Sequence, residues 1–179
     1  MSENNYIKAT PLHQVLQIQR PTIKDDRGFF RESVRTKAIE EEIGVPFVVV
    51  QANHARSTKN ILRGIHIAPW NKLIYVARGI VQSVIVDLRK DSPTFGKYES
   101  FLIGEENRSS IFVPAGCGNA YLVLSDVADY TYLTDQEWAA NKEYGIAWND
   151  PTLAVDWKLS GEPNLSDRDK TNPIFKEKF

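Results

Sequence analysis

Cysteine and histidine are scarce in this sequence, and their scarcity excludes several kinds of site. Cys117 is the one cysteine in 179 residues, so the chain can form no internal disulfide, and we expect a reducing, cytoplasmic environment. Cys117 also lacks the cysteine and histidine companions of a zinc site. Of the three histidines, His13, His54 and His66, the last is followed two residues later by Ala68, where a metal-binding β-barrel would place a second histidine. The sequence therefore predicts no metal and no other cofactor.

The sequence also lacks an excess of charge of either sign, and it lacks long apolar runs. Lys and Arg number 22 and Asp and Glu number 23, which gives a net charge of −1 and excludes the basic surface of a nucleic-acid-binding protein. No run of apolar residues is long enough to span a membrane, and the polar start of the chain has no basic region followed by an apolar one. We therefore expect a soluble protein with no membrane or nucleic-acid partner.

Short strands dominate what is present. The length suits one domain with a sizeable core, so we predict a single domain over residues 1–179. One short helix is expected at 37–42, and the polar tail around 166–170 has the composition of a mobile surface segment. So many strands with one weak helix predict an all-β sandwich or barrel. The expected strands are residues 14–18, 29–34, 47–51, 73–77, 80–88, 98–103, 110–113, 120–124 and 129–134.

Three chemically useful side chains, Arg63, His66 and Lys72, occur in the segment 62–73. On a regular strand Arg63 and His66 would point to opposite faces, unless Gly64 kinks or bulges the chain. An ordinary structural explanation is a strand end with a solvated arginine and lysine and a histidine that fills a polar gap. As a functional group, His66 would be a metal-free base, since an unperturbed imidazole titrates near neutral pH.

A histidine base needs an orienting carboxylate, and its substrate needs an acid on the opposite side. Asp167 or Asp169 in the tail can supply the carboxylate by folding back. Tyr130 and Tyr132 share one face of a predicted strand, so either can be the acid. The local pattern does not choose within these pairs, and both tyrosines can equally be core residues.

Several short motifs in order along the chain are together similar to the dTDP-4-dehydrorhamnose 3,5-epimerase family. The similarity runs from about residue 27 to residue 170. Each motif is weak alone, but their collinear order makes the set specific. The motifs are 27–32 (RGFFRE), 51–53 (QAN), 63–66 (RGIH), 72–73 (KL), 86–89 (VDLR), 92–96 (SPTFG), 113–116 (VPAG) and 148–151 (WNDP).

This resemblance implies a cupin-like jelly-roll β-sandwich or barrel with short peripheral helices, assembled as a homodimer that exchanges strand elements. It implies a nucleotide diphosphate-linked 4-keto sugar as substrate, inverted at C3, C5 or both by proton transfer through an enolate, for surface polysaccharide synthesis. By motif position the catalytic groups would be His66 as base, Asp169 as its partner, Tyr132 as acid and Lys72 beside the ketone. The implied substrate contacts are Gln51, Asn53, Arg63, Asn119, Trp138 and Lys170, with Arg27, Phe30 and Glu32 supplied by the partner subunit.

The chain departs from the family pattern at positions around the expected ligand. Asn119 stands where the family usually has histidine, and Leu133 replaces the lysine of the tyrosine motif. Thymidine is the default base, but guanosine or cytidine and a hexose or heptose stay open. Two alternatives also stay open: a sugar-nucleotide binder without turnover, and a 3,4-ketoisomerase, for which His54 is the candidate second histidine.

Overall fold

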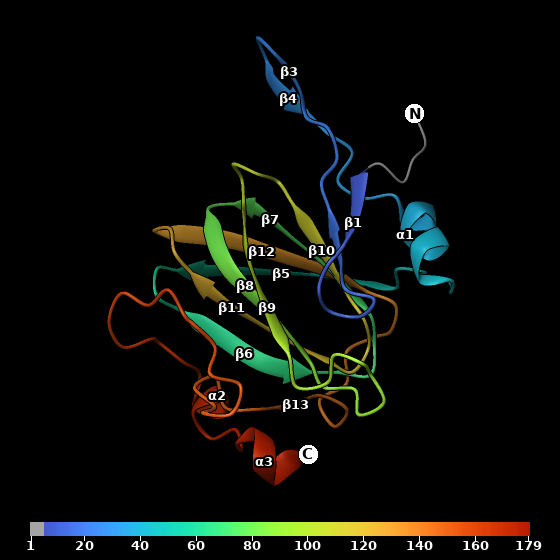
Figure 1. Ribbon diagram of the computed structural model, residues 1–179. Helices are drawn as coiled ribbons and strands as arrows, with labels where there is room; N and C mark the ends of the chain where they lie inside the picture. The colour runs from blue at the N-terminus through green and yellow to red at the C-terminus, as the bar shows by residue number, and fades with distance from the viewer. Residues whose placement is uncertain (1–5) are drawn as a thin grey trace.

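The computed structural model describes residues 6–179, and most of its strands form two antiparallel sheets packed face to face (Figure 1). The six-stranded sheet has the spatial order β1 (Ile7–Ala9), β2 (Leu16–Ile18), β10 (Ser110–Val113), β7 (Lys72–Arg78), β12 (Val127–Thr134) and β5 (Gln51–Thr58). The five-stranded sheet has the order β13 (Tyr144–Gly145), β6 (Leu62–Ile67), β11 (Cys117–Val123), β8 (Ile80–Asp87) and β9 (Tyr98–Gly104). This architecture is the predicted all-β, cupin-like jelly roll. Residues 1–5 of the predicted domain lie outside the described residues.

The remaining elements lie at the periphery of the sandwich. β3 (Ile23–Asp25) and β4 (Gly28–Phe30) form a separate two-stranded hairpin that projects from the body (Figure 1). The helices are α1 (Thr36–Ile43), α2 (Asp167–Lys170) and α3 (Phe175–Lys178), and α1 contains the predicted helix 37–42. No helix in the described part of the chain is long and apolar enough to cross a membrane.

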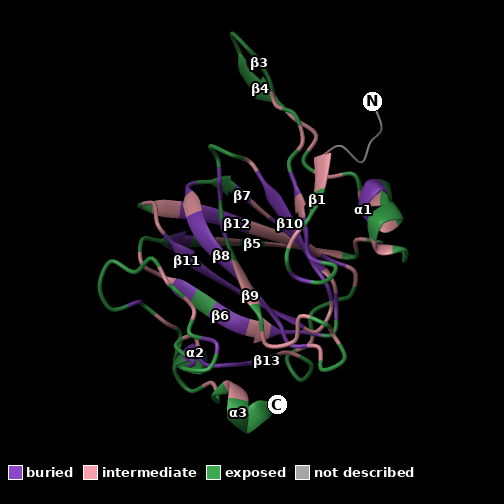
Figure 2. Ribbon diagram, viewed as in Figure 1, coloured by how far each residue is buried: buried purple, intermediate pink, exposed green. Residues whose placement is uncertain are grey.

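The main core lies between the sheets, where the strands are mostly buried (Figure 2). β8 is buried on both faces, because Val81 and Ile85 belong to the core between the sheets while Val84 and Val86 pack in a second cluster. Trp157 and Phe175 of the C-terminal segment pack against that second cluster. The C-terminal segment therefore covers the outer face of the five-stranded sheet and is fixed there by apolar contacts.

The predicted buried strand over residues 47–51 is wrong. Phe47 is fully buried and packs edge-on against Phe112, with ring centroids 5.3 Å apart. Val48 and Val50, however, are 65% and 53% exposed, and β5 begins only at Gln51. The apolar run anchors the approach to the sheet edge through Phe47 and the partly buried Val49, and pairing with β12 begins at its end, where the Val50 N–H donates to the Thr134 carbonyl at 2.9 Å. The polar continuation that follows residue 51 is the actual strand.

Two further expectations also differ from the structure. The predicted strand 29–34 ends early, because β4 pairs only with β3 and residues 31–34 have no strand partner on their way to α1. The predicted mobile tail instead contains α2, whose N-terminus is capped by Ser166: its hydroxyl accepts from the Asp169 N–H at 3.2 Å. Asp169 itself is 3% exposed. Buried polar contacts, which composition does not reveal, order this segment.

Candidate functional site

A cavity of about 160 Å³ lies where β5, β7 and β12 of one sheet face β6 and β11 of the other. Its wall combines cationic, aromatic and amide side chains, which is the composition expected of a site for a polar ligand with a ring. The lining residues are Ala55, Arg63, His66, Lys72, Asn119, Tyr121, Tyr130, Tyr132, Trp138 and Glu143.

Gly64 brings Arg63 and His66 to the same cavity. Its φ is +128°, and a Cβ at this position would lie 2.4 Å from the Cβ of Ala120. The register between β6 and β11 shifts opposite this point, between Asn119 and Tyr121. Only glycine fits both the dihedral angle and the close approach. The predicted irregularity at Gly64 is confirmed, and it explains why residues three apart on one strand share a site.

His66 is hydrogen-bonded to Asp169, which α2 carries back to β6. The His66 Nε2 to Asp169 Oδ1 distance is 2.6 Å, and Asp169 Oδ2 accepts from the Gly64 N–H at 3.3 Å. Burial raises the pKa of Asp169, but the hydrogen bonds from His66, Gly64 and Ser166 and the charge of His66 outweigh it, so the pKa lies below its ordinary value. An ionised carboxylate at Nε2 places the imidazole hydrogen there and leaves Nδ1 as the basic nitrogen.

The structure also separates the two candidate carboxylates of the tail. Asp167 is fully exposed, and its Oδ1 is paired with Lys170 Nζ at 2.9 Å. This ion pair holds Lys170 on the surface, outside the residues that line the cavity. Asp169 is therefore the carboxylate that reaches His66.

Lys72 is a buried cation with no ion-pair partner among the described residues. It is 4% exposed, and no described residue forms an ion pair or hydrogen bond with its Nζ. Burial lowers its pKa, with the charge of Arg168 acting in the same direction and that of Glu143 opposing both. Nζ lies 5.9 Å from the centroid of the Tyr132 ring. An unpaired ammonium in a closed site can stabilise negative charge that develops on a bound molecule.

The two tyrosines of β12 have different environments. Tyr130 is 1% exposed, and its hydroxyl donates to Asn119 Oδ1 at 3.1 Å. Tyr132 lines the same cavity, and no described residue hydrogen-bonds its hydroxyl. Burial, followed by the negative charge of Glu143, raises the pKa of Tyr132, which keeps the phenol protonated. Tyr132 is therefore the tyrosine whose proton is available to a ligand.

Gln51 and Asn53 do not line the cavity, but hydrogen bonds connect them to Trp138, which does. Gln51 Nε2 donates to Asn53 Oδ1 at 2.7 Å, and the backbone N–H of Trp138 donates to Gln51 Oε1 at 2.9 Å. The Trp138 side chain lines the cavity and is 51% exposed. The contact holds the backbone of Trp138 beside β5, and its half-exposed ring at the cavity can stack on a flat ligand group.

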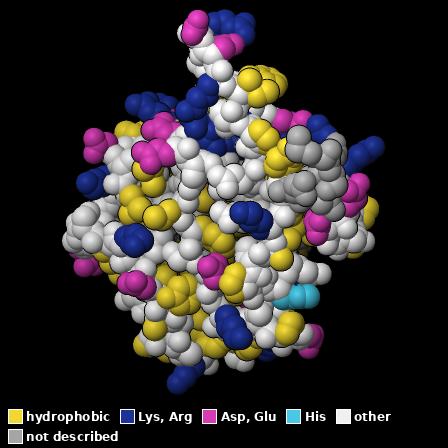
Figure 3. Space-filling view, turned by 45° about the horizontal axis from the view of Figure 1, so that its top comes forward, with side chains coloured by type: hydrophobic (Ala, Val, Ile, Leu, Met, Phe, Trp, Pro, Cys, Tyr) yellow, Lys and Arg dark blue, Asp and Glu magenta, His cyan; other side chains and the backbone are white. Residues whose placement is uncertain are grey.

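Arg27, Phe30 and Glu32 do not line this cavity. Arg27 pairs with Asp25 at the exposed tip of the β3–β4 hairpin, which projects at the top of Figure 3. Phe30 is 71% exposed, and Glu32 forms ion pairs with Arg20 and Arg35. These three residues are remote from His66 within one chain.

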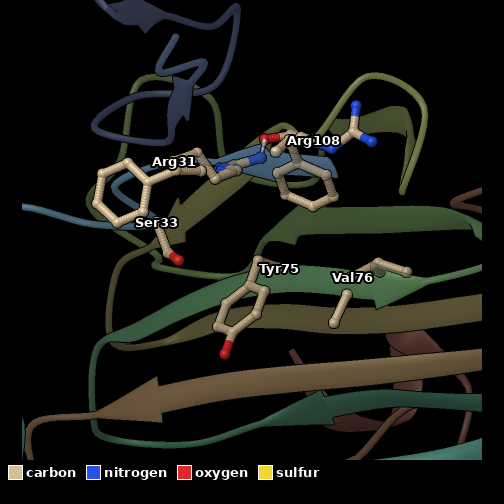
Figure 4. Close-up of a pocket in the computed structure, with 8 residues that line it drawn as sticks. Arg31, Ser33, Tyr75, Val76 and Arg108 are labelled. Atoms are coloured by element: carbon tan, nitrogen blue, oxygen red, sulfur yellow. Dashed lines mark hydrogen bonds between the residues drawn. The ribbon is translucent and has the colours of Figure 1, made fainter. Parts of the chain in front are cut away.

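A second cavity, of about 300 Å³, lies at the base of the hairpin (Figure 4). Arg31 donates to the carbonyl of Arg108 above Tyr75, and burial, followed by the charges of Arg108 and Arg20, lowers the pKa of Arg31. The side chains that line this cavity include no carboxylate and no histidine. It therefore offers positive charge and apolar surface, without a base for proton transfer.

Sequence reasoning missed Glu143, which lines the main cavity. Its Oε1 pairs with Arg168 Nη1 at 2.8 Å, and its side chain is 10% exposed. The ion pair between Glu143 and Arg168 connects the segment just before β13 with α2. β13 in turn pairs with β6 at His66. Glu143 lies in a segment without strand or helix periodicity, so no local signal marks it. The separation from β6 along the chain hides the contact.

The structure also bears on two alternatives for the site. His54 Nε2 lies 2.9 Å from Asp129 Oδ1, and the His54 side chain is 59% exposed and does not line the cavity. A second histidine, which a ketoisomerase would use, is therefore not beside His66. No cluster of His, Cys, Asp and Glu suited to a metal ion occurs within residues 6–179.

Comparisons with known proteins agree on one family. The model of the dTDP-4-dehydrorhamnose 3,5-epimerase family matches residues 9–177. A dTDP-4-dehydrorhamnose 3,5-epimerase from Pseudomonas aeruginosa is 40% identical over 174 residues, which cover 94% of this chain and 96% of that protein.

Two solved structures are similar along most of the chain. The epimerase RmlC from Legionella pneumophila, in complex with dTDP-4-keto-L-rhamnose, superposes with a TM-score of 0.90 at 35% identity, covering 94% of this chain and 91% of that chain. The 3'-monoepimerase ChmJ from Streptomyces bikiniensis, in complex with dTDP-quinovose, has a TM-score of 0.88 at 32% identity, covering 92% of this chain and 85% of that chain.

Proposed function

Because the chain belongs to the dTDP-4-dehydrorhamnose 3,5-epimerase family, we propose that it inverts C3, C5 or both of a dTDP-linked 4-keto-6-deoxy sugar. The observation that carries this proposal is the 2.6 Å contact between His66 and Asp169 in a cavity that also contains Lys72 and Tyr132. This set combines an oriented base, a cation and a protonated phenol. Those are the groups that inversion beside a ketone needs.

Each group has a defined task in the proposed reaction. Nδ1 of His66 removes the proton from the carbon next to the C4 ketone, while Asp169 stabilises the imidazolium that forms. The electron pair moves onto the ketone oxygen, and Lys72 stabilises the resulting enolate because no described residue forms an ion pair with its ammonium, while Glu143 of the same cavity is paired with Arg168. Tyr132 then returns a proton to the opposite face, which inverts the centre.

The substrate contacts follow from the remaining lining residues. Arg63 is a cation at the cavity, and its guanidinium can bind a diphosphate through aligned N–H donors. The Trp138 ring at the rim suits a nucleotide base, and the two similar solved structures contain dTDP sugars. We take thymidine as the base on this ground. A nucleotide-linked sugar is an activated glycosyl donor, so we place the product before glycosyl transfer into a surface polysaccharide.

We also propose a homodimer in which the hairpin of each chain completes the site of the other. Arg27, Phe30 and Glu32 lie outside the cavity of their own chain, as described above. Ile23 and Phe29 of the hairpin are 67% and 54% exposed, although both are large and apolar. Such side chains on a projecting element favour a protein contact, and a second copy of the chain supplies one.

Proton NMR in deuterium oxide tests the function directly. The protein is mixed with 4-keto-6-deoxy sugars linked to thymidine, guanosine and cytidine diphosphate, and the C3 and C5 signals are followed. We expect one or both signals of the dTDP sugar to disappear with appearance of an epimer, and His66→Asn to abolish the exchange. Exchange that persists in His66→Asn would overturn the mechanism.

The same experiment addresses the non-catalytic alternative. A protein that only binds sugar nucleotides would incorporate no deuterium into any member of the panel, although calorimetry would detect binding. A 3,4-ketoisomerase would shift the carbonyl from C4 to C3, which changes the carbon spectrum and leaves no 4-keto epimer. The exposed position of His54, paired with Asp129, argues against that second outcome.

A further inference from the structure

Two buried tyrosines from opposite sheets stack at the wall of the main cavity. The rings of Tyr121 on β11 and Tyr130 on β12 are nearly parallel, with centroids 3.9 Å apart and an interplanar angle of 11°. The residues are 4% and 1% exposed. A buried phenol hydroxyl needs a hydrogen-bond partner, so each ring brings one polar contact into an otherwise apolar stack. The two hydroxyls have different partners.

The Tyr130 hydroxyl is hydrogen-bonded to the carboxamide of Asn119. It donates to Asn119 Oδ1 at 3.1 Å across the space between the sheets. A carboxamide has one acceptor oxygen and one NH₂ group with two donors, and rotation by about 180° exchanges their positions. With the oxygen bonded to Tyr130, the NH₂ group points away from that tyrosine. No described residue accepts a hydrogen bond from it, and Asn119 lines the cavity.

We propose that Tyr130 is a positioning residue, which holds the Asn119 carboxamide so that this side chain presents only N–H donors to an acceptor oxygen of the nucleotide sugar. The identity of the ligand rests on the proposed function above. A freely rotating carboxamide would offer its oxygen to a ligand donor as readily as its NH₂ group to an acceptor. Tyr130 removes that ambiguity, because the reversed orientation loses a buried hydrogen bond.

The charge of the cavity supports an acceptor as the occupant. Asn119 shares the cavity wall with Lys72 and Arg63, both of which are hydrogen-bond donors without an acceptor function. Phosphate, carbonyl and hydroxyl oxygens can all accept hydrogen bonds from these donors. Glu143, the carboxylate in this lining, is paired with Arg168, so the Asn119 amide adds a neutral donor beside two cations.

Tyr121 provides a matched control within the same stack. Its hydroxyl lies 3.4 Å from Ser57 Oγ, which also accepts from Arg63 Nε at 3.2 Å. Tyr121→Phe therefore removes a hydroxyl of the same kind from the same ring pair but leaves the Asn119 contact in place. Tyr130→Phe removes the contact to Asn119 and retains the stacked ring.

A double-mutant cycle between Tyr130→Phe and Asn119→Ala tests the proposal. Affinities are measured by calorimetry in a His66→Asn background, so that the dTDP-linked 4-keto sugar is not consumed, and dTDP alone is the second ligand. We expect Tyr130→Phe to weaken sugar-nucleotide binding by about 2- to 12-fold, the range for one hydrogen bond, and to have no further effect in Asn119→Ala. Tyr121→Phe should retain its own effect in that background.

The outcomes separate the possible sources of the acceptor oxygen. Coupling that is already present with dTDP assigns the oxygen to the diphosphate, and coupling seen only with the sugar nucleotide assigns it to the sugar; both support the proposal. In the active protein, Tyr130→Phe should raise KM by the same factor with little change in kcat. The proposal would be overturned if Tyr130→Phe weakened binding equally in the presence of Asn119 and in Asn119→Ala. It would also be overturned if Tyr130→Phe lowered kcat and left KM unchanged. The cycle needs no turnover, so it stays informative if the proposed reaction fails.

Discussion

The side chains of His66 and Asp169 are 103 residues apart in the sequence and 2.6 Å apart in the structure. The contact depends on α2, a single helical turn that Ser166 caps and that returns to β6 at Gly64. Because the carboxylate is 3% exposed, its hydrogen bonds are shielded from water and hold the imidazole in one tautomer. The geometry makes Asp169 the residue that orients the His66 ring in the cavity.

Asp169→Asn should separate orientation of the base from substrate binding. An amide can donate to Nε2, which would move the imidazole hydrogen to Nδ1 and block proton abstraction. We expect kcat for deuterium exchange to fall by about 10²-fold or more, with little change in KM. Asp167→Asn, the same substitution at an exposed position two residues away, is the control and should retain kcat. Equal loss in both variants would contradict the assignment.

Asp169→Asn should also change the stability of the protein in a pH-dependent way. The pKa of Asp169 is lowered in the folded protein, so its stabilising contribution is present above the unfolded-state pKa, at about pH 4. It is lost as pH falls through the lower folded-state pKa. Urea unfolding should therefore show Asp169→Asn destabilised by about 1–3 kcal/mol at pH 7, with the difference shrinking below pH 4. A constant difference from pH 7 to pH 2 would be inconsistent with this linkage.

Tyr132→Phe should uncouple proton removal from inversion. His66 can still abstract the proton and return deuterium from solvent to the same face, so exchange persists without a change of configuration. We expect epimer formation to fall by about 10²- to 10⁴-fold relative to exchange, measured by NMR of the recovered sugar nucleotide. If epimer formation and exchange fall together, Tyr132 is required for proton removal as well, contrary to a role as acid alone.

Lys72→Met should abolish activity without unfolding the protein. Methionine has a similar length, and it removes a buried ammonium that has no anionic partner among the described residues. We expect the free energy of unfolding at pH 7 to rise by on the order of 1 kcal/mol, while epimerisation becomes undetectable.

The stabilisation expected for Lys72→Met should depend on pH, because the pKa of Lys72 is lowered in the folded protein. The folded state binds fewer protons at this site than the unfolded state between the two pKa values, so the parent gains stability as pH rises through that range. The advantage of Lys72→Met should therefore decrease toward about pH 10. Unfolding curves that show the variant less stable at every pH would contradict the view that burial of the ammonium is costly.

Phe30→Ser tests the proposed exchange of hairpins. Phe30 is 71% exposed in one chain, so its loss should change the stability of that chain by no more than about 0.5 kcal/mol. We expect the dimer seen by analytical ultracentrifugation to weaken and KM for the sugar nucleotide to rise. Val48→Ser, which alters an apolar residue that is 65% exposed outside the hairpin, is the control. Monomeric parent protein with full activity would exclude a shared site.

The sequence by itself determined the fold class and predicted which residue types make up the candidate site. Strands such as β8 and β12 were predicted close to their observed bounds, because a short β-forming run between turn residues is a local property of the sequence. Glycine at position 64 marked the irregularity beside His66 for a similar reason: its conformational freedom belongs to the residue. The collinear motifs indicated the family, which the comparisons then showed.

Only the tertiary structure decided which side chains meet. It chose Asp169 over Asp167, paired Tyr130 with Asn119 and left Tyr132 without a partner in the described chain. It also brought Glu143 to the cavity through a segment without periodicity. These choices depend on contacts between distant segments, such as α2 folding back onto β6, and on burial that neither composition nor local spacing contains. The local sequence pattern specifies where strands form, whereas long-range packing specifies which side chains contact one another.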